Sequence, residues 1–172
     1  MKSGWQNETA EPTDWEQWLV AQVPALLLFA RQQTRCEADA QDVLQEAAVE
    51  CWARQRNGQV PPLPFVFATI RRRALDLARS NDRRAHREFA VSADSPQSWF
   101  DSSVEERERS RLLQEAMTSL PETYRDVITL KIWGGLTFEQ IAETLAVPAN
   151  TAASRYRYGL EQLRRMTKEI LA

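Results

Sequence analysis

Apolar residues recur at three- and four-residue steps along most of the chain, which is the spacing of one face of an α-helix. The first such stripe follows Thr13 and Asp14, which suit a helix N-cap, and it has Pro24 in its middle, where we expect a kink or a break. This stripe comprises Trp15, Trp18, Leu19, Val23, Leu26, Leu27 and Ala30. The same spacing predicts six further helices, at about 37–55, 65–87, 105–120, 122–133, 137–145 and 150–170.

Breaks in this helical pattern divide the chain into two parts. Residues 1–12 are polar and predict a flexible N-terminal tail, and residues 89–104 are rich in Ser and Asp and predict a flexible linker. The fold predicted is therefore all-α, with two small helical domains at 13–88 and 105–172. The pair Trp99-Phe100 is unusual for a linker, and it indicates that the linker docks on a domain or clamps the two domains together.

The net charge of −2 gives no indication of nucleic acid, but the distribution of charge does. Seven arginines lie between residues 71 and 87, opposed there only by Asp76 and Asp82, whereas the stretch 88–122 is mostly acidic. Such block asymmetry indicates separate surfaces for separate partners. The alternative is that the charged blocks are only solvated helix faces.

Two cysteines and one histidine cannot supply a four-ligand zinc site, and no Cys-x-x-Cys is present. We expect no metal and no cofactor, and we expect Cys36 and Cys51 to be buried or half-buried thiols in a reducing cytoplasm. The absence of a nucleophile–base pair or a phosphate loop argues against an enzyme. No signal peptide and no apolar run long enough for a bilayer are found, so the sequence predicts a cytoplasmic protein without membrane insertion.

The segment from about Thr137 to Arg165 has the pattern of a helix-turn-helix. Thr137 and Gln140 form a capping box, Val147-Pro148 makes a turn, and Asn150 is expected to cap the second helix. In that helix Thr151 and Ser154, with Arg155 beside them, are placed to meet base edges, and Arg157, Arg164 and Arg165 are placed to meet phosphates. The alternative is an ordinary helical hairpin with a basic face.

Two further helix faces have distinctive chemistry. On the helix from 65, one side carries an aromatic ring and arginines, which suits single-stranded DNA because bases stack on the ring while arginines contact phosphates. That side comprises Phe65, Thr69, Arg72, Asp76, Arg79 and Arg83, with Asp76 expected to orient a neighbouring arginine. The alternative is that Phe65 packs against the proline-rich loop at 57–64.

The helix at 37–55 has an acidic, amide-rich face that would repel nucleic acid and suits a basic protein surface. This face comprises Asp39, Asp42, Gln45, Glu46 and Glu50. Its buried stripe is predicted to comprise Val43, Leu44, Ala47, Ala48, Cys51 and Trp52. The alternative is that the acidic face only keeps the protein in solution.

Several of these segments resemble the motifs of bacterial sigma factors. Residues 39–47, DAQDVLQEA, resemble the region-two signature D-A-E-D-[LV]-[LV]-Q-E-[VTA], and residues 65–76 resemble the helix that follows it. Residues 120–128 and 136–143 resemble the region-four pattern L-P-x-x-x-R followed by [ST]-x-x-E-I-A, and 150–155 resembles the start of its recognition helix. The motifs occur in the family's order with a short linker, which is similar to the extracytoplasmic-function group (ECF, group 4) of the sigma-70 family.

The resemblance implies a role for each surface. It implies binding to core RNA polymerase, through its beta and beta-prime subunits, by Asp39, Asp42, Gln45 and Glu46. It implies binding of the minus-ten promoter element by Phe65, Thr69, Arg72, Arg79 and Arg83. It implies binding of the minus-thirty-five element by Thr151, Ser154, Arg155, Arg157 and Tyr158. An anti-sigma factor is a further partner that the resemblance leaves open.

The chain departs from the family pattern at several positions. The usual Trp is Phe65, the usual Lys in the recognition helix is Ala153, and a later basic position is Tyr158. Two other functions stay open at this point: a helix-turn-helix regulator that acts without polymerase, and a helical protein-interaction module with no DNA role. The regulator would leave the acidic face and the arginine-rich helix without a function.

Overall fold

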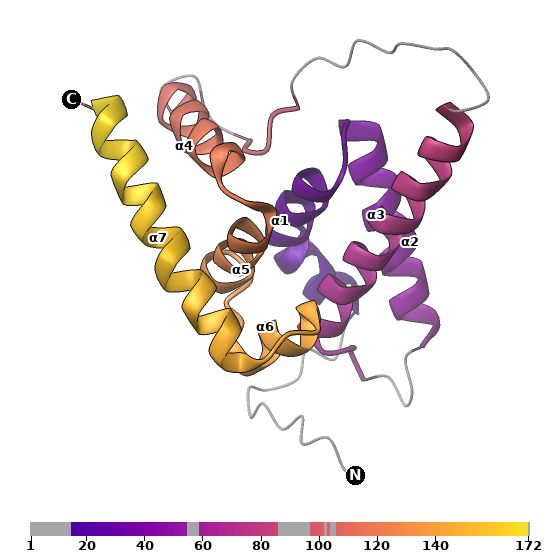
Figure 1. Ribbon diagram of the computed structural model, residues 1–172. Coiled ribbons are helices and arrows are strands. Elements are labelled where there is room, and N and C mark those ends of the chain that lie inside the picture. The colour runs from indigo at the N-terminus through magenta and orange to yellow at the C-terminus, as the bar shows by residue number, and fades with distance from the viewer. Residues whose placement is uncertain (1–14, 55–58, 86–96, 102, 104–105, 172) are drawn as a thin grey trace.

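The computed structural model describes residues 15–54, 59–85, 97–101, 103 and 106–171, and these contain seven α-helices and no strand. The all-α prediction is confirmed, and the predicted helix boundaries agree to within two residues (Figure 1). The helices are α1 (Trp15–Gln33), α2 (Glu37–Ala53), α3 (Leu63–Ala85), α4 (Arg107–Ser119), α5 (Glu122–Ile132), α6 (Phe138–Leu145) and α7 (Ala149–Leu171). The predicted tail at 1–12 lies outside the described residues, as does most of the predicted linker.

Helix α1 runs without a break through Pro24, contrary to the break that was one of the two outcomes expected there. A proline inside a helix costs about 3 kcal/mol because one backbone hydrogen bond is lost. Both halves of α1 are nevertheless held by packing, since Trp15 and Trp18 pack against the core and Leu26 and Phe29 are fully buried. Tertiary burial on both sides of Pro24 therefore outweighs the local penalty.

Helix α3 begins at Leu63, two residues before the predicted start, so Pro64 lies in its first turn. The first backbone N–H groups of a helix have no partner within it, and a proline there costs little. The backbone N–H of Phe65 already bonds to the carbonyl of Pro62 at 2.9 Å. The proline-rich segment thus starts the helix instead of only preceding it.

The helix-turn-helix prediction is confirmed in the geometry of α6 and its turn. Thr137 accepts a hydrogen bond from the backbone N–H of Gln140, whose side chain accepts one from the Thr137 N–H, which completes the capping box. Ala146 then adopts a left-handed conformation with φ of 55°, which ends α6. Helix α7 begins at Ala149, so the prediction that Asn150 caps it is wrong: Asn150 lies in the first turn, and the carbonyl that begins the helix belongs to Pro148.

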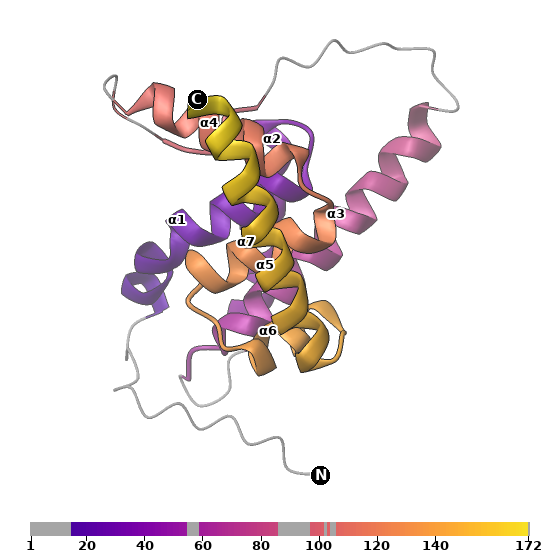
Figure 2. The same cartoon turned by 60° about the vertical axis from the view of Figure 1, so that its left-hand side comes forward.

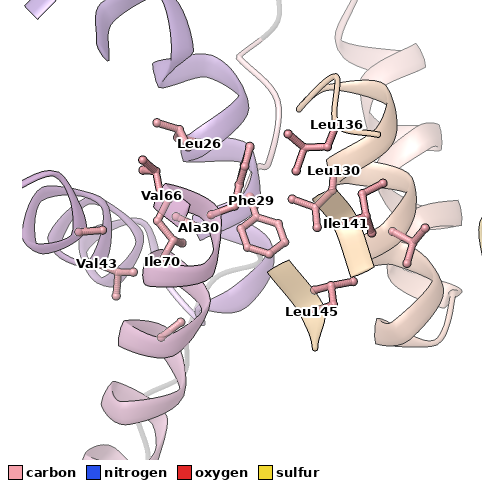
Figure 3. Close-up of a cluster of buried hydrophobic side chains, with 14 of the residues drawn as sticks. Leu26, Phe29, Ala30, Val43, Val66, Ile70, Leu130, Leu136, Ile141 and Leu145 are labelled. Atoms are coloured by element: carbon pink, nitrogen blue, oxygen red, sulfur yellow. The ribbon is translucent and has the colours of Figure 1, made fainter. Parts of the chain in front are cut away.

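The two groups of helices share one hydrophobic core, which the sequence pattern did not predict. Helices α1–α3 form one bundle and α4–α7 a second, and α5 and α6 lie against α1 and α3, with α7 on the outer side of α5 (Figures 1 and 2). In the core, Phe29 lies between Val66 and Ile70 on one side and Leu130 and Ile141 on the other (Figure 3). The two predicted helical domains are therefore packed against each other in this structure.

The described part of the linker is docked. Trp99 is 8% exposed and packs with Leu28 of α1 and with Met117 and Ile128 of α4 and α5. The Trp99 ring contacts helices of both groups, which is the arrangement expected if the linker clamps the two domains together. In the part of the chain that the structure describes, no helix is long and apolar enough to cross a membrane.

Candidate functional site

The acidic face predicted on α2 is exposed along part of its length, whereas Glu50, predicted to belong to it, is mostly buried with 13% of its side chain exposed. Asp42, Gln45 and Glu46 are exposed, whereas Asp39 is half-buried at the start of the helix. Glu46 lies 3.4 Å from Arg73 of α3, a weak contact at the edge of the face. Three of the four residues predicted to bind polymerase can therefore be reached by a partner along one side of α2.

The same side of α2 continues into apolar residues that the sequence pattern misplaced. Trp52, predicted to be buried, is 59% exposed, and Val49 is 60% exposed. Helix α3 covers the Cys51 side of α2, so the residue one position further along is turned outward. The exposed residues Ala38, Asp42, Gln45, Val49 and Trp52 follow each other at three- and four-residue steps and form one surface, here called the α2 stripe. Their spacing could be seen in the sequence. Only the position of α3 shows that it covers the Cys51 face of α2 and leaves the Val49–Trp52 face exposed.

Glu50 organises the arginines at the junction of α2 and α3. Its carboxylate accepts hydrogen bonds from Arg72 at 2.6 Å and from Arg73 at 2.7 Å, and Arg54 lies 3.0 Å away. Burial raises the pKa of Glu50, but the hydrogen bonds from Arg72 and Arg73 outweigh this, so the net pKa is lowered. Arg72, predicted to contact DNA, is thus held in place with half of its side chain still exposed.

The aromatic end of α3 differs in part from the prediction. Thr69 is only 3% exposed, because it faces Cys51 and donates a hydrogen bond to the Phe65 carbonyl at 2.8 Å. Its predicted place on the exposed side is therefore wrong. Phe65 is half-buried against the core, with the guanidinium of Arg54 5.6 Å from its ring centre. Phe65 is therefore neither fully exposed, as the DNA-binding side requires, nor fully buried.

Further along α3, the basic side is open. Arg79 and Arg83 are exposed, and Asp76 lies 3.7 Å from Arg79, which agrees with its predicted role of orienting a neighbouring arginine. Arg71 points instead toward the second helix group, where it lies 3.9 Å from Asp126. The arginines of α3 are therefore divided between an exposed face and a contact between the two bundles.

The first turns of α7 are accessible. Thr151, Ser154 and Arg155 are half-exposed, and Arg157 and Tyr158 are exposed, with the Arg157 guanidinium 5.0 Å from the Tyr158 ring centre. The Ser154 hydroxyl donates to the carbonyl of Asn150 at 2.8 Å, so its lone pairs stay available to accept a hydrogen bond. The five residues predicted for base and phosphate contact lie together on one helix, and its inner side carries the buried Ala152 and Gly159.

Comparison with known proteins assigns both groups of helices to known domain families. Residues 19–84 match the family model of sigma-70 region 2, and residues 110–163 match that of sigma-70 region 4. The chain is 30% identical over 132 residues to the ECF RNA polymerase sigma factor SigK of Mycobacterium ulcerans, an alignment covering 73% of this chain and 70% of that protein. The chain therefore belongs to the ECF sigma factors. This sigma factor is also 27% identical over 155 residues to RNA polymerase sigma-E factor of Streptomyces coelicolor, covering 90% of this chain and 86% of that protein.

A solved structure supports the fold. The sigma factor RpoE, in its complex with the anti-sigma factor NepR from Bartonella quintana, superposes with a TM-score of 0.68 at 21% identity, covering 91% of this chain and 98% of that one. In this sigma factor the α2 stripe and the arginines of α3 lie within region 2, and the first turns of α7 lie within region 4. As an RNA polymerase sigma factor it acts in transcription initiation, and a regulator working without polymerase is not favoured.

Proposed function

We propose that this sigma factor binds core RNA polymerase through the α2 stripe and then contacts two promoter elements, with α3 at the minus-ten element and α7 at the minus-thirty-five element. The observation that supports this proposal best is the stripe itself. Its N-terminal half, with Asp42 and Gln45, suits a basic partner, and its C-terminal half exposes Val49 and Trp52, of which Trp52 is of the residue types that form interface hot spots. A surface that is acidic at one end and apolar at the other fits a protein, since DNA would be repelled.

The promoter surfaces follow from charge and exposure. Arg72, Arg79 and Arg83 are arginines that α3 leaves exposed, and Phe65 lies half-buried at the start of the same helix. This combination suits a single strand, whose bases stack while its phosphates meet arginines. On α7 the first-turn residues suit base edges in the major groove, as in other helix-turn-helix proteins. We place the protein in the cytoplasm, where polymerase is found.

An anti-sigma factor is a further proposed partner. The RpoE chain that shares this fold is bound to one, and sigma factors of the same family are candidates for the same kind of control. Co-purification of the chain with the product of a neighbouring gene, followed by loss of core binding in the complex, would support this proposal.

The α2 stripe can be tested by making the same substitution at two exposed valines, one inside the stripe and one outside it. Val49→Asp should weaken binding to core polymerase by at least about ten-fold, because a charge is buried in the contact. Val20→Asp is the control, since Val20 is 72% exposed on α1 and lies outside the stripe. Asp42→Arg should weaken binding through the other half of the stripe. Fluorescence titration with core polymerase measures all three variants. Equal affinity of Val49→Asp and Val20→Asp would refute the stripe as the docking surface.

A further inference from the structure

At the junction of α2 and α3 a single carboxylate is shared by three arginines. Glu50 of α2 has 13% of its side chain exposed and pairs with Arg72 and Arg73 of α3 and with Arg54 at the end of α2. These four residues are called the Glu50 cluster. The two helices pack along each other (Figure 1), and Phe65 lies in the first turn of α3. Because the cluster holds three positive groups and one negative group, it can still accept an anion.

The arginines of the Glu50 cluster are bound in two different ways. Arg73 places both Nε and Nη2 on the Oε2 atom of Glu50, at 3.0 and 2.7 Å, and its Nη1 lies 3.4 Å from Glu46. The Arg73 side chain is 35% exposed and is held toward α2. Arg73 therefore fixes the position of the Glu50 carboxylate.

Arg54 and Arg72 reach the carboxylate with one nitrogen each. The Nη2 atom of Arg72 lies 2.6 Å from Oε1 and 2.7 Å from Oε2 of Glu50, and the Nη2 atom of Arg54 lies 3.0 Å from Oε1. A guanidinium group has five N–H donors, so both arginines keep donors for a second acceptor. The Arg54 side chain is 61% exposed and the Arg72 side chain 51%, which leaves these donors within reach of a ligand.

A flat stacking surface lies beside these donors. The guanidinium carbon of Arg54 is 5.6 Å from the centre of the half-buried Phe65 ring. Unpaired nucleic-acid bases stack on aromatic rings and also on the plane of an arginine guanidinium. The exposed side of the Glu50 cluster thus combines hydrogen-bond donors suited to a phosphate with a surface suited to the base attached to it.

We propose that Arg54 and Arg72 together bind one phosphate of single-stranded DNA at the minus-ten element, and that Glu50 is the positioning residue that holds both arginines ready for it. This role rests on the one proposed above for α3, and it adds two residues of α2 to the same surface. Arg54 is thereby a DNA contact that helical periodicity did not indicate. Glu50, which the sequence pattern grouped with the polymerase-facing acidic residues, belongs to the DNA side.

A carboxylate within a DNA-binding surface has two opposed effects. Its charge repels phosphate, whereas its hydrogen bonds fix long side chains that would otherwise lose their freedom on binding. Ordering one such side chain on binding lowers affinity by about two- to ten-fold. Glu50 fixes two of them, and its charge is already shared among three guanidinium groups. Removal of the negative charge should therefore weaken binding to DNA.

Glu50→Gln tests the sign of this effect. The substitution keeps the shape of the side chain and makes the full chain more positive by one charge. Binding of the full chain, without polymerase, to a short fluorescein-labelled single strand of mixed sequence is measured by anisotropy at several salt concentrations. We expect binding at least about three-fold weaker than that of wild type, because Arg54 and Arg72 are no longer fixed. A general attraction between charges predicts the opposite result, which is tighter binding.

Glu108→Gln is the matched control for the change of charge. Glu108 of α4 also pairs with an arginine, since Arg111 lies 2.7 Å away, and it lies outside the Glu50 cluster. Glu108→Gln should bind the single strand as tightly as wild type or slightly more tightly. A merely structural role of Glu50 would lower the stability of Glu50→Gln and leave the affinity of the folded variant unchanged.

Arg54→Gln tests the phosphate contact itself. Affinity should fall at least about three-fold, and the slope of log affinity against log salt should become shallower by about 0.7, the value for one phosphate contact on a single strand. Because Arg54 is exposed at the end of α2, this variant should keep its helical circular dichroism. If Glu50→Gln loses that signal, Arg54→Gln decides alone.

Two results would overturn the inference: binding by folded Glu50→Gln that equals or exceeds that of wild type, or an unchanged affinity and salt slope in Arg54→Gln. Arg79→Ala separates this outcome from the proposed function, since Arg79 is 73% exposed further along α3 and lies outside the Glu50 cluster. A loss of affinity in Arg79→Ala alone would leave the promoter surface of α3 standing and remove the role of Glu50. Losses in Glu50→Gln and Arg54→Gln alone would support the phosphate site and argue against the rest of that surface.

Discussion

Burial against α1 and α3 gives Asp126 an acid–base behaviour unlike that of a surface carboxylate. Desolvation raises its pKa to about 6, the hydrogen bond from Gln33 opposes this, and Glu122 raises it further while Arg71 and Arg125 lower it. Asp126 is the described residue at which pH acts most directly on the contact between the regions. The carboxylate is ionised at neutral pH at a cost that its neighbours offset only in part.

The direction of the pH effect follows from this raised pKa. The folded state binds the Asp126 proton more tightly than the unfolded state, so stability should increase as pH falls from 7 through about 6. Asp126→Asn imitates the protonated form, and at pH 7.5 it should raise the free energy of unfolding by up to about 2–3 kcal/mol. Urea denaturation between pH 5 and 7.5 measures the effect.

Asp126 and Glu37 affect stability in different pH ranges. Hydrogen bonding to Arg31 lowers the pKa of Glu37 to about 2, so its stabilising contribution is lost only below its ordinary value near 4.5. Between pH 5 and 7.5 the wild type should therefore gain stability on acidification, and Asp126→Asn should lose this dependence. A wild-type stability that falls over this interval would contradict the assignment.

At the scale of elements, we propose that α7 makes two kinds of DNA contact. Arg155 lies in the first two turns and Arg164 further along, where only phosphates are within reach of a recognition helix. Arg155→Ala should lower affinity for the preferred minus-thirty-five sequence by about 1–3 kcal/mol and relax its preference, as expected for a base contact. Arg164→Ala should weaken all sequences alike. Binding of the assembled holoenzyme to a promoter library measures both variants, and a uniform loss with Arg155→Ala would assign it to phosphate contact.

Helical periodicity predicted the elements well because each helix of this chain buries one face, and its caps and breakers are local. The capping box of Thr137 and Gln140 is an example, since both partners lie within three residues of each other. Trp52 and Thr69 were misplaced for a different reason. A helix with apolar residues on two sides does not reveal which side its neighbour covers, and the answer came from the position of α3 against Cys51.

The contact between the regions could not be predicted from the sequence either. A helical pattern shows which face is buried, but not which helix from a distant part of the chain covers it. The apolar stripe of α5 shows that Val127 and Leu130 are buried, but not that Phe29 and Phe67 bury them. The periodic pattern does not mark Gln32 and Gln33 as buried, because a glutamine that is paired inside the protein has the same sequence pattern as one on the surface. Trp99 was the single local indication, as an aromatic residue in a polar linker. The sequence showed Glu50 as an acidic residue. Its role as the partner of three arginines could not be predicted, because it depends on how α2 packs on α3.

For the whole molecule, a core shared by both regions has a thermodynamic consequence. Elements that bury the same side chains lose their stability together, so regions 2 and 4 of the wild type should unfold in one cooperative transition. Once the contact between the regions is broken, each region retains only its own contacts and should unfold by itself. Region 4, with short helices such as α6, is expected to unfold first.

Calorimetry tests this coupling. Thr129→Lys places a charge in the contact between the regions, and Thr123→Lys makes the same change at an exposed position of α5. Wild type and Thr123→Lys should show a single transition with equal calorimetric and van't Hoff enthalpies, whereas Thr129→Lys should show two transitions, or one whose calorimetric enthalpy exceeds the van't Hoff value. Thr129 is 1% exposed and its hydroxyl donates to Gln32 of α1, so the change acts on the contact between the regions. Two transitions in the wild type would show that the shared core is too weak to couple the regions. A single transition in Thr129→Lys, at an unchanged midpoint, would show that the lysine is accommodated and that the contact between the regions does not depend on Thr129.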